Sequence, residues 1–355
     1  MKITAATMRE VAQRARVSTS TVSLALRNSV LVAEDTRAKI RKLADKMGYR
    51  IHPFVAAHMR SRRNPSAGVS APVIALIDAQ PHRHGWRDHP NAMLRAMFLG
   101  VEAQARIRGY KTQSFWLHEP GISQTRFSEI LRARGINGVV IGPSSELQLS
   151  LALNWEWFSV VRLGSAHISP MLHRVVVDHY EASMMTTQRA YELGYRRPGL
   201  TVREPFGVAH ERRYEAGFMM TCAHLPKMRP VPPLLTSQVP DGPTLLRWIR
   251  QYSPDVIIDA EERHNYDLLR AAGWRVPHDI GVLSLCAPNP AGPLSGCVQD
   301  GYCVGSAGIE HLIAMIERNE TGVPSAPMTL SSGVTWNPGN TVVSKFTKKT
   351  AKHFK

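Results

Sequence analysis

The sequence predicts an α/β protein with two parts, an all-α headpiece at the N-terminus and a two-lobed core of doubly wound parallel sheets. Three observations predict this fold class. The first 50 residues contain three short amphipathic helix patterns. From residue 72 onward, short apolar strands alternate with amphipathic helices, which is typical of parallel sheets covered on both faces. The alternation runs through two series of similar length, which favours two lobes with a ligand cleft between them.

The charge of the chain is concentrated at its two ends. The 355 residues include 44 Lys and Arg against 28 Asp and Glu, a net charge of +16. Residues 1–65 carry +10 and the residues from Lys345 onward carry +5, so the segment between them is nearly neutral. A basic head favours a polyanionic partner, and the alternative is a solvated face that keeps the protein soluble.

The remaining composition indicates the compartment. No apolar run approaches the roughly 18 residues that a membrane helix needs. The N-terminus lacks the apolar segment of a secretory signal. Four Cys in a chain of 355 residues fit a reducing environment. We therefore expect a cytoplasmic protein.

The headpiece pattern consists of three short helices. Thr7 and Glu10 form a capping-box pattern at the start of the first helix. Ser18 caps a second helix from Thr19 to about residue 27, and a third helix runs over about 33–47. Two short helices joined by a tight turn and braced by a third are the helix-turn-helix architecture.

The second helix has an unusual polar face. Thr19, Ser20, Thr21 and Ser23 lie on it, with Leu24 beside them. Hydroxyl-bearing residues are poor helix formers, but short side chains allow close approach, and hydroxyls bond to phosphate oxygens and base edges. We expect this face to contact DNA. The alternative is that Ser18 caps the helix and the other hydroxyls are merely tolerated.

The stretches M-R-E-V-A-Q-R-A-R-V-S-T-S-T-V-S-L-A-L-R-N and E-D-T-R-A-K-I-R-K-L-A-D-K-M-G-Y-R resemble the headpiece of the lactose/galactose-repressor (LacI) family, over about residues 7–60. The family usually has Arg at the position of Leu24, and Arg27 is inserted before Asn28, so the operator sequence does not carry over. The resemblance implies DNA contacts at Thr7, Ser18, Thr19, Ser20, Thr21, Leu24, Arg27, Asn28, Tyr49, Ala56, His58 and Met59.

Residues 51–71 form a predicted hinge helix and linker. Pro53 suits the first turn of a helix, and the residues after it are strongly apolar. In the resembled family this helix pairs with its dimer mate and drives an apolar wedge into the minor groove. The wedge position falls here at His58 or Met59, of which Met is the usual kind of wedge. A plain interdomain helix is the alternative.

The core repeats strand–helix units. The first series has strands at 73–77, 112–116, 138–141 and 160–163, with helices at about 92–108 and 123–133. The second has strands at 175–177, 200–202, 256–258 and 282–285, with helices at 180–193, 214–224, 244–251 and 266–272. The stretches R-V-V-V-D-H-Y-E-A, R-Y-E-A-G-F and P-D-V-I-I-D-A make this core similar to the periplasmic-binding-protein-like core of the same family. The resemblance implies a homodimer whose lobes close on a small, sugar-like effector.

These patterns divide the chain into four segments. We expect the headpiece at 1–50, the hinge helix and linker at 51–71, the core at 72–345 and a basic tail at 346–355. Within the core, we expect lobe 1 at about 72–164 plus 300–325. Lobe 2 then comprises about 165–299 plus 326–345.

The resemblance gives the least information about which residues bind the effector. Sugar-binding members commonly place an Asp near Gly164, an Arg at the position of Tyr214 and an Asp at the position of Cys286, and this chain has none of the three. Arg213 could substitute for the Arg, and Trp86 could either stack on a sugar or pack. The candidate effector residues are Trp86, Arg213, Tyr214, Glu261, Glu262 and Cys286. A ligand other than an ordinary hexose, or no ligand, stays open.

The remaining polar residues and residue groups favour structural roles. We expect Asp178 to cap the helix that follows it rather than to bind a ligand. The three His and one Asp within residues 82–89 could hold a metal, but a polar loop needs none, so we predict no metal site. The Cys lack close C-x-x-C pairs. No nucleophile elbow, dinucleotide fingerprint or phosphate loop occurs, so neither an enzyme nor a cofactor is predicted.

Taken together, these features predict a sequence-specific DNA-binding transcriptional regulator that acts as a repressor. It would bind a near-palindromic double-stranded operator as a homodimer, and a small-molecule effector would modulate its affinity. A solute-binding receptor or an enzyme built on the same two-lobed core is the alternative.

Overall fold

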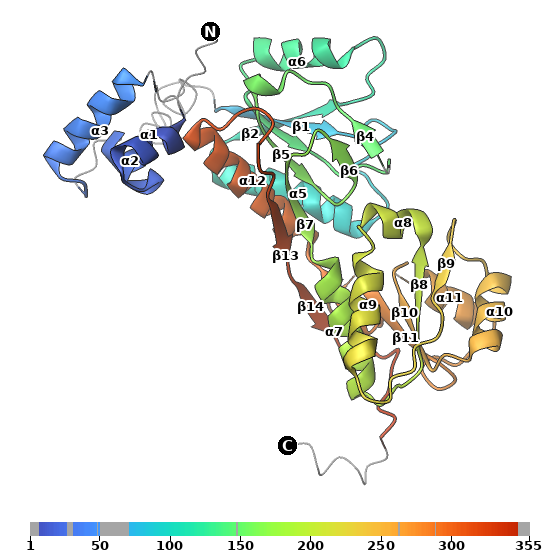
Figure 1. Ribbon diagram of the computed structural model, residues 1–355. Coiled ribbons are helices and arrows are strands. Elements are labelled where there is room, and N and C mark those ends of the chain that lie inside the picture. The colour runs from blue at the N-terminus through green and yellow to red at the C-terminus, as the bar shows by residue number, and fades with distance from the viewer. Residues whose placement is uncertain are drawn as a thin grey trace.

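The computed structural model describes residues 7–26, 31–47, 49, 71–146, 148–261, 263–287 and 289–346 (Figure 1). The predicted hinge helix and most of the basic tail lie outside the described residues. So do six of the predicted site residues: Arg27, Asn28, Ala56, His58, Met59 and Glu262. Within the described ranges, no helix has the length and apolar character needed to cross a membrane.

The headpiece folds into three helices, as predicted: α1 (Met8–Ala15), α2 (Thr19–Leu26) and α3 (Glu34–Lys46). The capping box at the start of α1 is formed, because the Thr7 hydroxyl accepts from the Glu10 N–H and the Glu10 carboxylate accepts from the Thr7 N–H. Arg16 ends α1 in the left-handed conformation, with φ of 56°. A small shared core, which includes Val11, Val22 and Ile40, holds the three helices together.

The first lobe is a parallel six-stranded sheet in the order β13-β7-β5-β3-β1-β2. Its strands are β1 (Val73–Asp78), β2 (Lys111–Trp116), β3 (Gly138–Ile141), β5 (Ser159–Leu163), β7 (His173–Val177) and β13 (Thr329–Ser332). Helices α5 (Ala92–Ile107) and α12 (Gly301–Arg318) share one core with this sheet, and α6 (Gln124–Ala133) shares another. Alternate residues of β1 divide between the two cores, so the sheet is covered on both faces.

Helices α5 and α12 approach each other closely because glycines line their contact. A Cβ added to Gly305 would lie 2.0 Å from the Met97 carbonyl oxygen, and one added to Gly301 would lie 2.1 Å from that of Met93. Any larger side chain at these positions would push the helices apart. The glycines therefore fix the distance between α5 and α12, the first and last described helices of the lobe.

The second lobe is also a six-stranded sheet, in the order β14-β12-β11-β10-β8-β9. Its strands are β8 (Pro198–Arg203), β9 (Leu234–Thr236), β10 (Val256–Asp259), β11 (Gly281–Ala287), β12 (Gly296–Gln299) and β14 (Val334–Asn337), of which β14 alone runs antiparallel. Its helices are α7 (His179–Glu192), α8 (Glu204–Ala209), α9 (Arg213–His224), α10 (Gly242–Tyr252) and α11 (His264–Ala271). Smaller elements in lobe 1 are a strand pair, β4 (Gln148–Ser150) with β6 (His167–Ser169), and a 3-10 turn, η1 (Trp155–Trp157).

The lobe boundaries differ from those predicted at two places. Strand β7 was assigned to lobe 2 but pairs with β5 and β13 in the first sheet. Residues 326–345 were assigned wholly to lobe 2, but β13 lies in the first sheet and only β14 in the second. The chain thus crosses between lobes after β7, after β12 and between β13 and β14 (Figure 1). A strand followed by a helix has the same sequence pattern in either sheet, so the pattern could not place β7.

Candidate functional site

The start of α2 carries the headpiece residues predicted to meet DNA. The Ser18 hydroxyl accepts from the Thr21 N–H at 3.1 Å, so Ser18 caps the helix as expected. It also lies 2.8 Å from the Thr21 hydroxyl, which keeps both side chains on the same side of the first turn. Ser20 is exposed, whereas Thr19 and Ser23 are half-buried. Ser20 is therefore the hydroxyl of this turn that is most available to a partner.

Two predicted DNA contacts contribute to packing instead of standing free. Leu24 is half-buried and packs against the headpiece core. Tyr49 is 3% exposed and belongs to that core, which leaves little of its ring for DNA to touch. The exposed cations of the described headpiece are Arg9, Arg14, Arg16, Lys39, Arg41, Lys42 and Lys46. They supply the positive surface that the sequence predicts.

Trp86, a candidate either to stack on a ligand or to pack, lies in the core of lobe 1. It is 1% exposed, and its indole N–H donates to the Leu94 carbonyl at 3.1 Å. Its ring meets Phe98 edge-to-face at 5.3 Å and covers Gly142, where an added Cβ would lie 2.4 Å from the ring. Of the two interpretations, the structure therefore supports packing and not stacking on a ligand.

Tyr214 is also a packing residue. It is fully buried at the start of α9, and its hydroxyl bonds to the Gln299 side-chain amide at 2.7 Å. Burial, first among several causes, raises the Tyr214 pKa well above its ordinary value. Cys286 is half-buried beside the Ala260 carbonyl, 3.4 Å from its sulfur. Neither side chain projects freely from its strand or helix end.

The two charged candidates are both ion-paired. Glu261, after β10, pairs with Arg203 at the end of β8 at 2.6 Å. Arg213 pairs with Glu211 at 3.1 Å. Glu211 pairs in addition with Arg174 of β7 at 2.6 Å, so one carboxylate joins a strand of lobe 1 to the turn between α8 and α9 of lobe 2. Hydrogen bonding from Arg174, with the charge of Arg213 added, lowers the Glu211 pKa to about 2.

Sequence reasoning missed the other basic groups at this junction. Arg162 of β5 stands in register with Arg174 of β7. His179, the first residue of α7, is buried, and its ring lies 4.3 Å from that of His210. The available signal was the presence of charged residues within otherwise apolar strands, because an Arg is rarely fully buried unless it is paired.

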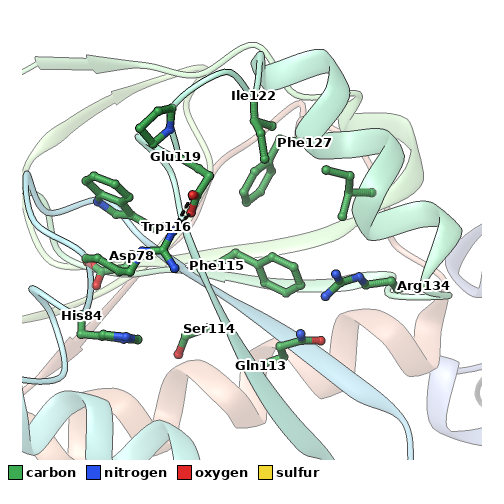
Figure 2. Close-up of a pocket in the computed structure, with 13 residues that line it drawn as sticks. Asp78, His84, Gln113, Ser114, Phe115, Trp116, Glu119, Ile122, Phe127 and Arg134 are labelled. Atoms are coloured by element: carbon green, nitrogen blue, oxygen red, sulfur yellow. Dashed lines mark hydrogen bonds and ion pairs between the residues drawn. The ribbon is translucent and has the colours of Figure 1, made fainter.

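A cavity of about 320 Å³ lies elsewhere in lobe 1, along β2 (Figure 2). Figure 2 shows Phe115 of β2 between Trp116 and Glu119 on one side and Arg134, the residue that follows α6, on the other. The Arg83–Glu119 ion pair lies at this cavity, and the buried Asp78 carboxylate accepts from the N–H groups of Gln80 and Trp86. None of the predicted effector residues lines it.

Metal binding finds no support in the described part of the chain. There, no three His, Cys, Asp or Glu side chains are grouped so as to hold a metal ion. In the loop of residues 82–89, the His89 ring nitrogen accepts from the Asn91 N–H at 3.0 Å, and Asp88 pairs with Arg87. Asp178 caps α7 as predicted, accepting from the Glu181 N–H at 3.0 Å.

Comparison with known proteins identifies the headpiece. Residues 7–51 match the family model described as bacterial regulatory proteins, lacI family. Over these residues the headpiece is similar to the lacI family.

Curated regulators are similar to longer parts of the chain. The NTD biosynthesis operon regulator NtdR of Bacillus subtilis is 22% identical over 59% of this chain and 59% of its own length. The transcriptional repressor CytR of Escherichia coli is 25% identical over 55% of this chain and 53% of its own length. Catabolite control protein A of Staphylococcus epidermidis is 22% identical over 90% of this chain and 95% of its own length. The chain thus spans little more than half the length of the first two.

Solved structures share the fold of the core and headpiece. A transcriptional regulator CelR–cellobiose complex has a TM-score of 0.54 at 18% identity and covers 95% of this chain and 99% of its own. The lac repressor dimer bound to operator and the anti-inducer ONPF has a TM-score of 0.53 at 16% identity and covers 96% of this chain and all of its own. The fold class predicted from the sequence, a helix-turn-helix headpiece on a periplasmic-binding-protein-like core, is confirmed.

Proposed function

We propose that this chain is a sequence-specific DNA-binding transcriptional repressor that acts in the cytoplasm as a homodimer. The observation that carries the proposal is the start of α2: a capped helix that presents an exposed Ser20 and short hydroxyl side chains. Exposed cations on α1, on the residue that ends it and on α3 supply the phosphate contacts of the same headpiece. In this proposal α2 enters the major groove, and two headpieces of a dimer occupy the two halves of a near-palindromic operator.

The core supports the second half of the proposal, which is control by a small molecule. The relatives of this fold include a regulator bound to cellobiose and a lac repressor dimer bound to operator and an anti-inducer. Two lobes joined by three crossings can change their relative position when a ligand contacts both. A ligand that prefers one arrangement would shift the population of DNA-binding states by its difference in affinity for the two. A solute receptor or an enzyme would not need the headpiece.

The direct test is salt-dependent binding of the full-length protein to genomic fragments. Counterion release predicts that the logarithm of the binding constant falls linearly with the logarithm of salt concentration, with a slope of about −0.9 for each phosphate contact. We expect a steep slope together with enrichment of a near-palindromic fragment. Binding that is steep in salt but equal for all fragments would refute sequence-specific control. Absence of DNA binding would refute the proposal as a whole.

A second prediction concerns Ser20. Replacing Ser20 by Ala should weaken binding to the selected fragment by about 1 kcal/mol, the typical value of one hydrogen bond, and leave binding to random DNA unchanged. The salt slope should also stay the same, because base contacts carry no counterion term. Fluorescence anisotropy with labelled duplexes measures all three. Ser331→Ala, at an exposed serine of β13, is the matched control; an equal loss in both variants would remove Ser20 from base recognition.

A further inference from the structure

The junction between the lobes holds more positive than negative charge. Arg162 and Arg174 lie side by side on β5 and β7, and Arg213 begins α9. Glu211 is the carboxylate that pairs with Arg174 and Arg213. Among the described contacts of Arg162 there is no carboxylate. We call Arg162, Arg174, His179 and Arg213 the junction cluster, with Glu211 as its internal counter-ion.

Arg162 is buried with no carboxylate among its described hydrogen-bond partners. It is 1% exposed, and its Nη1 donates to the carbonyl oxygens of Gly164 at 3.0 Å and Ala166 at 2.6 Å. Its Nε is buried with no acceptor. Burial, with the charge of Arg174 added, lowers the Arg162 pKa to about 10 although the charge of Glu211 raises it, so the guanidinium stays charged at neutral pH. Glu211 is already paired with Arg174 and Arg213, so one carboxylate serves three guanidinium groups. Buried positive charge in excess of its counter-ions is unfavourable unless something else supplies negative charge.

His179, also in the junction cluster, provides a second buried polar atom without a hydrogen-bond partner. It is 5% exposed, and its Nδ1 has no hydrogen-bond partner. Burial first, and then the charges of His210, Arg213 and Arg174, lower its pKa well below the ordinary value. His179 is therefore a neutral imidazole beside the arginines. A neutral imidazole has one N–H to donate, and which nitrogen carries it depends on its partner.

The turn that brings Glu211 to the junction cluster is strained. Glu211 and the next residue, Arg212, both adopt the left-handed conformation, with φ of 55° and 52°. Residues other than glycine pay a free-energy cost there, and two in succession are held only by their surroundings. The ion pair of Glu211 with Arg174 holds this turn against a strand of the other lobe, and its pair with Arg213 ties it to the start of α9. Loss of these pairs would free the turn to relax.

We propose that the junction cluster binds the phosphate or carboxylate group of an anionic effector, and that Glu211 is the internal counter-ion which this group displaces. The inference rests on the proposed function, in which the core senses a small molecule. Arg side chains suit the bidentate recognition of both groups. Displacement breaks the Arg174–Glu211 pair, which joins the lobes, so occupancy and lobe position are coupled. The Asp, Arg and Asp that sugar-binding members commonly have are absent at Gly164, Tyr214 and Cys286. Their absence agrees with a ligand that is not a neutral hexose.

Calorimetric titration of the full-length protein tests the proposal, with inorganic phosphate, succinate and glucose as probes at constant ionic strength. We expect phosphate or succinate to bind and glucose not to bind. Arg162→Gln and Arg213→Gln should each weaken binding at least tenfold. Glu211→Gln should strengthen it at least tenfold, because the competing carboxylate is removed. The side chain of Arg213 is 39% exposed, so its replacement tests the site even if the Arg162 variant fails to fold.

Arg126→Gln is the matched control, because Arg126 is an exposed arginine on α6 with a local ion pair to Glu129 at 2.9 Å. Equal weakening in Arg126→Gln would show general attraction of anions to a basic protein and overturn the proposal. Weaker or unchanged binding in Glu211→Gln would overturn it too, as would glucose binding alone. The same variants are assayed on DNA without ligand, so failure of DNA binding is scored separately from failure of anion binding.

Discussion

Replacement of Trp86 by Ala should lower the free energy of unfolding by about 3–5 kcal/mol, the usual cost of emptying a buried aromatic site. The ring is 1% exposed, meets Phe98 edge-to-face and covers Gly142, so nothing nearby can fill the space without moving the sheet. The Leu94 carbonyl would also lose the indole N–H that now donates to it. Chemical denaturation of the full-length protein, followed by circular dichroism, measures the loss.

Trp116→Ala is the control for this prediction. Trp116 is half-buried at the cavity along β2, and its indole N–H also donates to a carbonyl, that of Gln80 at 2.9 Å. We expect a smaller loss there, because part of the ring already faces solvent. If Trp86→Ala left stability unchanged and abolished binding of a sugar, Trp86 would be a ligand contact and its assignment to the core would be wrong.

Replacement of Asp259 by Asn should stabilise the protein by up to about 3 kcal/mol above pH 6. Asp259, at the end of β10, is completely buried, and its Oδ1 accepts from Thr201 at 2.9 Å and Asn265 at 2.8 Å. Its Oδ2 has no partner, and neither has Oδ1 of Asn265. Burial raises the Asp259 pKa from 3.8 to about 6. An amide at this position carries no charge and offers a donor to the unpaired Asn265 oxygen.

The pH dependence follows from the sign of this shift. Between pH 4 and 6 the folded protein holds a proton on Asp259 that the unfolded chain has released, so the stability contributed by this group is lost as pH rises through that window. Below pH 4 both states are protonated, and the benefit of Asp259→Asn should disappear. Unfolding curves at pH 4 and pH 8 measure this difference. Asp267→Asn, which only removes an exposed pair with Arg263, should show no such gain. An equal gain at both pH values would contradict the explanation.

Most of the fold could be predicted because its signals are local. Strand β3 is buried at all four residues and reads as an uninterrupted apolar run, and the caps at Thr7, Ser18 and Asp178 lie within three residues of the amides they satisfy. The placement of β13 had no such signal. Its first three residues are exposed and it lies at the edge of the sheet, so only its pairing with β7 assigns it to a lobe.

The junction cluster could not be predicted because it depends on pairs that are far apart in the sequence. Arg162 and Arg174 become neighbours through strand pairing, and Arg174 reaches Glu211 across the lobes. In the sequence, Tyr214 stands at the position of the family's Arg, and the adjacent Arg213 was a possible substitute. In the structure Arg213 is an ion-paired, partly exposed cation, whereas Tyr214 is a buried phenol. The packing of α9 determines which of the two side chains is buried.

The three crossings between lobes have a consequence for synthesis on the ribosome. The first lobe begins at β1, but its sheet receives α12 and β13 only after the strands β8 to β12 of the second lobe have been made. Until then, the apolar side chains of β5 and β7 that share a core with α12, among them Val161, Leu163 and Val175, have no helix to cover them. Contacts of such long sequence separation form late. Until α12 has been synthesised, the nascent chain therefore exposes apolar side chains of an incomplete sheet. Such exposed surface promotes aggregation and is bound by chaperones.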